Sequence, residues 1–119
     1  PDMVAAAKAH VPQGRFATAP AEQQPFEEKT FDLVFMACVF HEVDDPVQTL
    51  REAKRLARQR IAILEYPPKA QPFGPPMHHR LTGEQVRTCA EQAGLRRFQQ
   101  VELRHVTLYL MEVSHGNIV

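Results

Sequence analysis

One stretch of the sequence, TFDLVFMACVFHE, constrains the fold of this chain more than any other. It contains an unbroken apolar run from Leu33 to Phe40, followed directly by two polar residues, His41 and Glu42. A strand covered on both faces loses the alternation of apolar and polar residues, so this run is typical of a fully buried parallel strand. A buried helix is the competing interpretation, but the β-branched and aromatic content and the DDP turn that follows favour the strand. Because open α/β sheets bind ligands beyond the carboxyl ends of their strands, His41 and Glu42 are candidate functional residues.

Length, charge and cysteine content limit the class of protein. A chain of 119 residues forms one domain, and its 14 basic and 14 acidic side chains cancel. The balance of charge argues against a nucleic acid or an anionic membrane as partner. The sequence has neither an apolar run of the roughly 20 residues that a bilayer span needs nor a secretion signal, so we expect a soluble cytoplasmic protein. Two cysteines without zinc-ligand spacing predict reduced thiols and no metal site.

Before the central strand, the sequence predicts one helix, one short strand and one exposed loop. The helix covers Pro1–Val11, where apolar residues recur at helical spacing on one side, and Pro12 ends it. The next segment, Arg15–Ala19, has the composition of a short strand. The loop APAEQQPFEEK contains two prolines and three glutamates, and we expect it to be exposed and rich in turns.

After the central strand, capping signals predict a helix and then a second buried strand. Asp45 is the expected N-cap and Pro46 the first helical residue. The expected buried stripe of this helix consists of Val47, Leu50, Ala53, Leu56 and Ala57. Arg60–Tyr66 is the second strand, and the proline-rich segment Lys69–Pro76 after it predicts an extended, partly mobile loop.

The last third of the chain predicts a helix and an antiparallel strand pair. Thr82 and Gln85 have the spacing of a capping box, and Gly94 marks the end of the helix. Phe98–Arg104 and Val106–Val113 have strand composition, and so short a link between them permits only antiparallel pairing. We expect one domain over residues 1–113 and a frayed tail over 114–119.

Taken in this order, the segments resemble the later part of a class I S-adenosylmethionine-dependent methyltransferase, of the type 11 and quinone-biosynthesis C-methyltransferase kind. The matching segments are PDMVAAAKA, PAEQQPF, FDLVFMACVFHEV, LREAKRLAR, RIAILEY and GPPMHHRLTGEQVRTCAEQAGL. The resemblance implies a Rossmann-like α/β sheet that ends in an antiparallel strand pair. It also implies transfer of a methyl group from S-adenosylmethionine to a small-molecule acceptor.

The resemblance also implies which residues would meet the cofactor. In this family the loop after the third strand touches the adenine, which assigns the adenine edge to Pro20, Ala21 and Glu22. The end of the fourth strand lines the methionine side, which assigns Ala37, Cys38 and Phe40, together with His41, to the region of the sulfonium. The family often has Asp at the position of Pro20, and proline offers neither a carboxylate nor a backbone donor.

Several polar residues remain open to two interpretations. His41 and Glu42 either orient or deprotonate the acceptor, or only cap the strand and bind water. The residues that follow the later strands, Glu65, Tyr66, His78 and His79, either face the substrate or are exposed to solvent. The two adjacent histidines have no third ligand at suitable spacing, so we do not expect a metal there. Cys38 has no oxyanion hole that a catalytic thiol would need, so we interpret it as a small buried apolar residue.

The chain departs from the family pattern at its beginning, because the first two strands and the glycine-rich loop have no counterpart in it. In the family's sheet those strands separate the third strand from the fourth. Their absence makes the fourth strand an edge that is prone to pair. We therefore expect the RFATA segment to close up on that strand or go elsewhere, or two chains to pair through it. The alternative to an enzyme is a truncated, non-catalytic remnant that self-associates and lacks a complete cofactor site.

Overall fold

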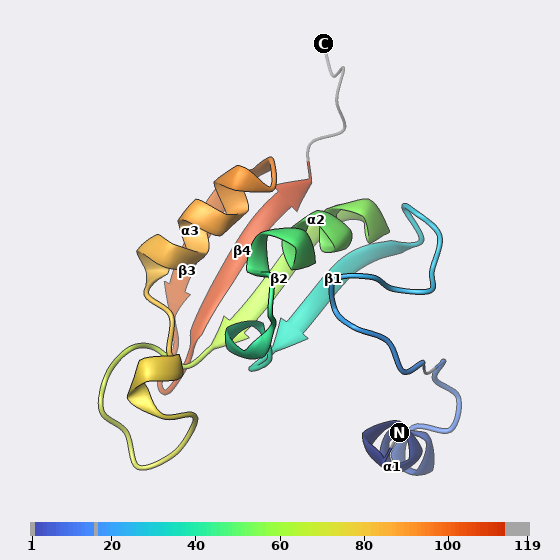
Figure 1. Cartoon of the computed structure of the whole chain (residues 1–119), viewed down its shortest axis with the longest axis horizontal. Helices are drawn as coiled ribbons and strands as arrows, with labels where there is room; N and C mark the ends of the chain where they lie inside the picture. The colour runs from blue at the N-terminus through green and yellow to red at the C-terminus, as the bar shows by residue number, and fades with distance from the viewer. Residues whose placement is uncertain (1, 16, 114–119) are drawn as a thin grey trace.

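Four strands form one mixed sheet in the computed structural model, which describes residues 2–15 and 17–113 (Figure 1). Their spatial order is β1-β2-β4-β3. The strands are β1 (Phe31–Ala37), β2 (Ala57–Glu65), β3 (Leu95–Glu102) and β4 (Thr107–Val113). β1 and β2 are parallel, whereas β4 is antiparallel to both of its neighbours. The carboxyl ends of β1 and β2 therefore meet at one end of the sheet.

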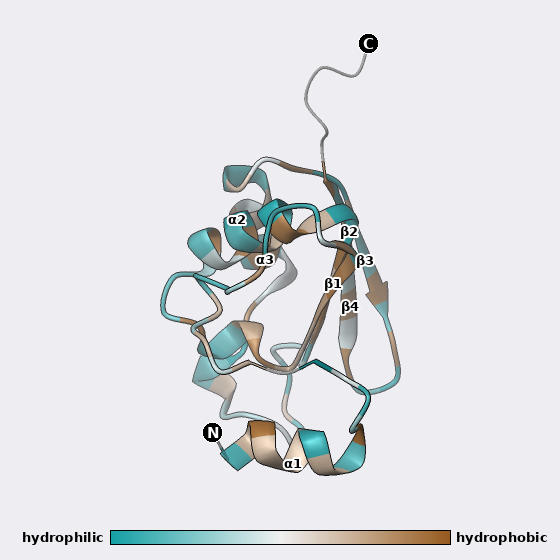
Figure 2. Ribbon diagram, turned by 90° about the vertical axis from the view of Figure 1, so that its right-hand side faces the viewer, coloured by the Kyte–Doolittle hydropathy of each residue, from teal (hydrophilic) through white to brown (hydrophobic). Residues whose placement is uncertain are grey.

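Two of the three helices cover one face of this sheet. The helices are α1 (Asp2–His10), α2 (Pro46–Leu56) and α3 (Gly83–Gln92), and two short 3-10 turns are η1 (Phe40–Glu42) and η2 (Met77–His79). Figure 2 shows α2 and α3 on the same side of the sheet, while α1 lies apart from it. Within the described part of the chain, none of the helices has the length and apolar character that a bilayer crossing requires.

The core lies between the sheet and the pair α2 and α3. Its fully buried members include Leu50 of α2, Val86 of α3, Ile61 of β2, and Tyr109 and Met111 of β4. Of the stripe predicted for the helix after the central strand, Leu50, Ala53 and Leu56 are buried on α2, as the helical spacing indicated. Val47 is only half-buried, and Ala57 is buried as the first residue of β2.

Local capping explains where α2 and α3 begin. The Asp45 carboxylate accepts the backbone N–H of Gln48 at 3.0 Å, and Pro46 follows as the first helical residue. Thr82 and Gln85 form the complete capping box, since each side chain accepts the other residue's backbone N–H. Both predicted helix starts are confirmed, because these signals depend only on residues that are close in sequence.

The central strand differs from the prediction in length and in burial. β1 ends at Ala37 rather than at Phe40, and Leu33 and Phe35 are 51% and 54% exposed. Only Val34 and Met36 pack against the core. The cause is position, because β1 is an edge strand in the described structure and only one of its faces is covered by a helix. From Leu33 onward its sequence is continuously apolar, yet exposed and partly buried side chains alternate along it.

Other predicted elements at the amino-terminal end also need correction. Arg15 and residues 17–19 form no strand, and Phe16 lies outside the described residues, as do Pro1 and the tail 114–119. The first helix is present as α1, but none of its described residues is buried and Met3 is exposed. Without a sheet partner, the RFATA segment does not close up on β1 in the described structure.

Two strands begin earlier than predicted, while their pairing is as expected. β2 starts at Ala57 because the chain passes from α2 into the strand without a loop, and it ends at Glu65. β3 starts at Leu95, directly after Gly94, whose φ of +80° ends α3. The antiparallel pairing of β3 with β4 is confirmed.

A buried carboxylate ties the loop that precedes β1 to α2. Glu52 accepts the backbone N–H of Gln24 at 2.6 Å and both Nε and Nη2 of Arg55, at 2.7 and 2.6 Å. Arg55 in turn donates to the carbonyl of Gln24 at 3.2 Å, and its own carbonyl accepts the N–H of Lys29 at 2.8 Å. The loop predicted to be exposed is therefore held against the helix at its middle, through Gln24, and at its end, through Lys29.

This clamp predicts a pH-dependent stability. The Arg55 hydrogen bonds hold the pKa of Glu52 below its ordinary value against the opposing effect of burial, and the Gln24 N–H adds to the lowering. A carboxylate whose pKa is lowered in the folded state stabilises the fold above its unfolded pKa of about 4.3, and this stabilisation is lost as the pH falls through the folded pKa. We expect Glu52→Gln to lower the free energy of unfolding at pH 7, and the difference from the unsubstituted chain to shrink at about pH 3.

Urea unfolding at pH 7 and at about pH 3 measures the loss of unfolding free energy in Glu52→Gln and its dependence on pH. Glu91→Gln, at an exposed position of α3, is the matched control and should change stability little at either pH. Equal destabilisation by Glu52→Gln at both pH values would contradict the assigned role of the charge.

Candidate functional site

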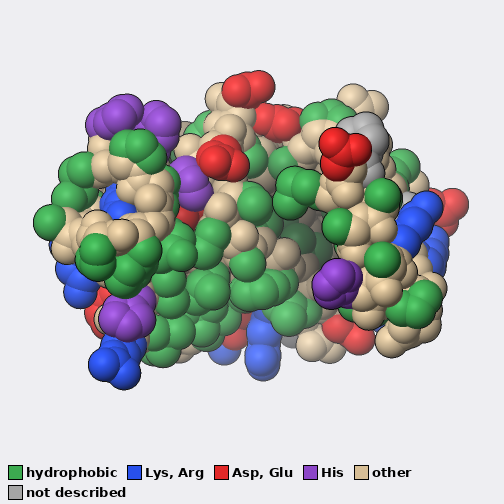
Figure 3. All heavy atoms as spheres, turned by 90° about the horizontal axis from the view of Figure 1, so that it is seen from below, with side chains coloured by type: hydrophobic (Ala, Val, Ile, Leu, Met, Phe, Trp, Pro, Cys, Tyr) green, Lys and Arg blue, Asp and Glu red, His purple; other side chains and the backbone are tan. Residues whose placement is uncertain are grey.

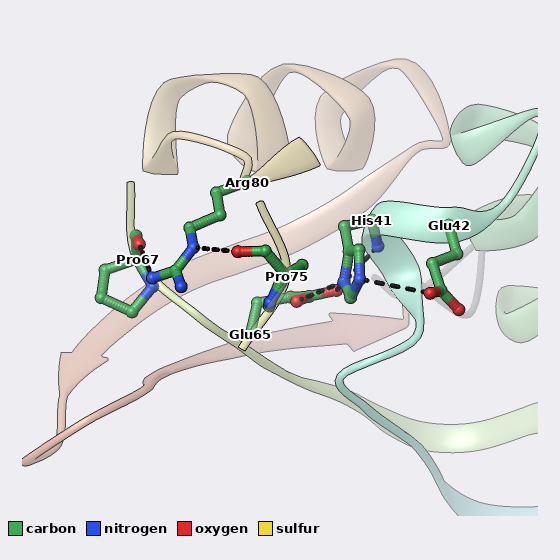
Figure 4. A network of polar contacts seen from close by, with 6 residues as sticks. All are labelled: His41, Glu42, Glu65, Pro67, Pro75 and Arg80. Carbon is green, nitrogen blue, oxygen red and sulfur yellow. Dashed lines mark hydrogen bonds and ion pairs between the residues drawn. The ribbon is translucent and has the colours of Figure 1, made fainter. Parts of the chain in front are cut away.

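A buried histidine and a buried glutamate meet where the two parallel strands end. The imidazole Nδ1 of His41 lies 2.9 Å from both carboxylate oxygens of Glu65, and the backbone N–H of His41 donates to Oε2 at 2.7 Å (Figure 4). The side chains of His41 and Glu65 are only 5% and 3% exposed. Two elements far apart in sequence, η1 and the end of β2, are joined by this pair.

The hydrogen bonds determine which imidazole nitrogen can accept a proton. An ionised carboxylate has no proton to donate, so Nδ1 of His41 carries the hydrogen that Glu65 accepts. In the neutral imidazole, Nε2 is then left as the acceptor. Nε2 lies 3.7 Å from Oε1 of Glu42, a residue whose side chain is exposed. The arrangement can therefore take up a proton at Nε2 while Glu65 stabilises the charge that results.

A strained turn carries the chain from β1 to His41. Cys38 has a φ of +56°, in the left-handed region that costs a residue with a Cβ roughly 1–2 kcal/mol. Its backbone N–H still donates to the carbonyl of Leu64 at 2.7 Å, so the turn begins while the chain remains paired with β2. Phe40 is buried in the core and fixes the start of η1. The left-handed conformation of Cys38 thus turns the chain out of β1, with Phe40 in the core and His41 beside Glu65.

Cys38 itself is not set up as a nucleophile. Burial raises the pKa of the Cys38 thiol and the charge of Glu65 raises it further, while a hydrogen bond with Tyr66 opposes them. A thiol with a raised pKa stays protonated at neutral pH, and the thiolate is the reactive form. Cys38 is half-buried rather than fully buried, but its chemistry agrees with the interpretation as a small apolar residue.

The residues assigned to the adenine edge take different roles in the structure. Ala21 helps to line a cavity of about 290 Å³ between the loop, β1 and α2, whose walls include Phe26 and Phe31. The carboxylate of Glu22 accepts the backbone N–H of Asp45 at 3.0 Å, directly before α2. The carbonyl of Pro20 accepts from the loop itself, including the N–H of Gln23 at 3.1 Å. Of the three, only Ala21 contributes to the wall of an open cavity.

The predicted substrate residues are not gathered in one place. Glu65 belongs to the buried pair, and Tyr66 packs under the guanidinium of Arg80, with 5.5 Å between Cζ and the ring centre. His78 and His79 lie exposed on η2, with ring centres 4.2 Å apart. Figure 3 views the end of the molecule where β1 and β2 finish: hydrophobic side chains fill its middle, and histidines lie at several separate places around them. The described residues contain no cluster of three or more groups able to hold a metal ion.

Sequence reasoning missed two charged residues that organise this region, Glu52 and Arg80. Glu52 lies on the buried side of α2, where its charge interrupts the apolar stripe. A charged residue within such a stripe is a weak indication that a buried ion pair or hydrogen bond is present. Arg80 follows a proline-rich loop and is buried, which nothing in the local sequence indicates. Four of the five acceptors of Arg80 are backbone carbonyls of the loop, and Glu52 binds the loop through the backbone N–H of Gln24. Such backbone partners have no sequence signature.

Comparison with known proteins places the chain in a family. The profile of a family described as a methyltransferase domain matches residues 1–62, which is more than half of the chain. A search of curated proteins finds no match.

Solved structures show the same fold. A crystal structure of a SAM-dependent methyltransferase from Aquifex aeolicus is 26% identical with a TM-score of 0.87, and the match covers 95% of this chain and 64% of the other. The CMeT domain of the citrinin polyketide synthase is 13% identical, with a TM-score of 0.78 over 95% of this chain and 37% of the other. The CurJ carbon methyltransferase is 16% identical, with a TM-score of 0.73 over 93% and 39%.

These matches also explain the incomplete sheet, since the chain spans less than two thirds of the length of the Aquifex protein. The four described strands and their helices correspond to part of a Rossmann-like methyltransferase fold. With its family profile, its fold and a polar pair at the carboxyl ends of two parallel strands, this chain belongs to the class I S-adenosylmethionine-dependent methyltransferases.

Proposed function

We propose that this protein transfers a methyl group from S-adenosylmethionine to a small-molecule acceptor, and that His41 accepts the acceptor's proton. The observation that carries this proposal is the His41–Glu65 pair, which leaves Nε2 as the proton-accepting nitrogen at the carboxyl end of the parallel strands. In open α/β sheets this end is where ligands bind. Membership of the methyltransferase family supplies the class of reaction.

The residues present fit one side of the cofactor. The cavity beside Ala21 has Phe26 and Phe31 in its wall, and such an apolar, aromatic lining suits a planar base. Ala37 and Cys38 would lie on the methionine side, next to the turn that precedes His41. Within residues 2–15 and 17–113 there is no glycine-rich loop that follows a strand, so the described residues account for only part of a cofactor site.

The cofactor, when bound, supplies a methyl group carried on a positively charged sulfur. Removal of a proton from an oxygen, nitrogen or carbon acceptor makes that atom a better nucleophile, and His41 can take this proton at Nε2. Glu65 offsets the positive charge that then forms on the imidazole and keeps the ring in place. General-base assistance of this kind typically contributes about 10²–10⁴-fold to the rate.

Calorimetric titration with S-adenosylhomocysteine tests the cofactor part of the proposal. We expect about micromolar affinity, because the cavity beside Ala21 and the end of β1 supply part of the contacts. No binding heat at millimolar ligand would contradict cofactor binding by this chain.

Substitution of His41 tests the catalytic part. His41→Asn retains an N–H that Glu65 can accept but has no site for a proton, so release of S-adenosylhomocysteine with a panel of phenol, amine and carbon-acid acceptors should fall about 10²-fold or more. His10→Asn, at an exposed position of α1, is the matched control. Unchanged turnover in His41→Asn would show that His41 is not the base.

A second property, self-association, is favoured by the edge position of β1. We propose that two chains pair through this strand, because Leu33 and Phe35 on it are exposed and its outer backbone groups face no strand in the described structure. An exposed apolar edge strand is a template for pairing with another chain. This property does not depend on catalysis.

Light scattering tests the pairing. We expect the 13.5 kDa chain to scatter as a dimer, and Phe35→Lys to shift it to the monomer because a lysine on an edge strand opposes pairing. Leu103→Lys places the same charge at an exposed leucine after β3, far from β1 in the sheet order, and should leave the mass unchanged. A monomeric unsubstituted chain, or equal effects of both substitutions, would contradict pairing through β1.

A further inference from the structure

The proline-rich loop between β2 and α3 is closed around one buried arginine. Arg80 is only 8% exposed, and its guanidinium donates hydrogen bonds to five oxygen atoms of the loop. The acceptors are the carbonyls of Pro67 (3.2 Å), Lys69 (3.0 Å), Phe73 (2.6 Å) and Pro75 (2.9 Å), and the side-chain oxygen of Gln71. The loop predicted to be extended and partly mobile thus folds around the Arg80 guanidinium and is hydrogen-bonded to it.

These bonds determine what Arg80 can do. A guanidinium has five N–H groups in a fixed plane, and Nε, Nη1 and Nη2 of Arg80 all donate to the loop. Little donor capacity remains for an anionic ligand. Hydrogen bonds to a charged group are stronger than neutral ones, so five acceptors on one cation give the loop a single conformation. The role of Arg80 is therefore to position the chain around it.

Tyr66 connects this loop to the His41–Glu65 pair. Its ring lies beneath the Arg80 guanidinium at 5.5 Å and beside the ring of Phe73 at 6.0 Å. Tyr66 also directly follows Glu65 in the chain, at the end of β2. The segment that supplies the carboxylate of the pair therefore continues directly into the residue on which Arg80 packs.

The packing above Tyr66 is tight. Gly74 has a φ of +86°, and a Cβ at this position would lie 3.0 Å from both the Tyr66 ring and Nη2 of Arg80. A glycine is needed here for its backbone conformation and for this close approach. The loop, Arg80 and Tyr66 consequently form one unit. Figure 4 shows Arg80 with Pro67 and Pro75 of this loop, beside the His41–Glu65 pair.

We propose that Arg80 is a positioning residue for the His41–Glu65 pair: by closing the 67–80 loop over Tyr66, it fixes the end of β2 where Glu65 orients His41. This inference rests on the proposed function for its catalytic meaning, although its structural content stands without it. The contacts above place Arg80 outside direct contact with His41, so any effect on the imidazole must pass through Tyr66 and Glu65.

Arg80→Lys tests the proposal in the whole chain, because lysine keeps the charge and the apolar stem but has a single nitrogen that cannot reach five acceptors. We expect amide hydrogen exchange in residues 67–79 to quicken about tenfold or more while β2 and β4 keep their protection. In nitrogen NMR spectra, the Nδ1-protonated tautomer of His41 should give way to a mixture of tautomers. Arg104→Lys, at an exposed position between β3 and β4, is the matched control.

A second variant, Gly74→Ala, changes the packing of the loop on Tyr66 without changing Arg80. Gly74→Ala introduces a Cβ into the contact with Tyr66 and Arg80, so it should produce the same local pattern of exchange and the same change at His41. Unchanged exchange and an unchanged His41 spectrum in Arg80→Lys would overturn the proposal. Faster exchange that extends equally over β2 and β4 would also overturn it, because Arg80 would then serve only global stability.

These readouts separate this proposal from the proposed function. Exchange rates and the His41 tautomer are measured without cofactor or acceptor, whereas the proposed function fails on absent S-adenosylhomocysteine binding or on unchanged turnover in His41→Asn. Either proposal can therefore fail while the other stands.

Discussion

The parallel pairing of β1 with β2 determines where His41 and Glu65 lie. The register places Ala37 opposite Leu64, so Cys38 turns out of the sheet next to Glu65, the last residue of β2. Successive side chains of a strand point to opposite faces, so a slip of one residue would turn Glu65 away from His41. The apolar residues of β2 that are buried beneath α2 and α3 prevent such a slip, since it would expose Ile61 and Ile63. The register that buries Ile61 and Ile63 is thus the same register that places Glu65 beside His41.

Buried charge is the second principle of this structure. Glu52, Glu65 and Arg80 are all buried, and each has hydrogen-bond partners in place of solvent: Gln24 and Arg55 for Glu52, His41 for Glu65, and the 67–75 segment for Arg80. Among the described residues, no buried side-chain nitrogen or oxygen lacks a partner. The prolines of the 67–76 segment contribute to this, because they have no N–H and do not extend a strand, which leaves carbonyl groups free to turn towards Arg80. Each buried charge therefore fixes a loop that regular hydrogen bonding would not hold.

The parts of the fold that the sequence predicts are those set by neighbours along the chain. Asp45, Thr82 and Gly94 act within one helical turn, and the helices they delimit begin and end as expected. His41 is a candidate because ligands of α/β sheets bind beyond strand ends, and the structure places it beside Glu65, while its catalytic role stays a prediction. The burial of β1 was predicted wrongly, because exposure of Leu33 and Phe35 depends on what lies beside the strand and not on the strand itself. Arg80 could not be predicted at all, since its partners are carbonyl groups, which every residue has.

The mismatch between the sequence of β1 and its surroundings has a consequence for the site. The strand is apolar on both faces, yet one face and one edge are uncovered in the described structure, and a cavity of about 290 Å³ borders it. Any chain that covers β1 binds the folded strand and not the unfolded one, so it stabilises the fold by mass action. The turn at Cys38 and the His41–Glu65 pair follow directly from this strand, and they gain order with it. Occupancy of the open edge and the geometry of the His41–Glu65 pair are therefore thermodynamically linked, and the proposed proton transfer at His41 would depend on this edge strand.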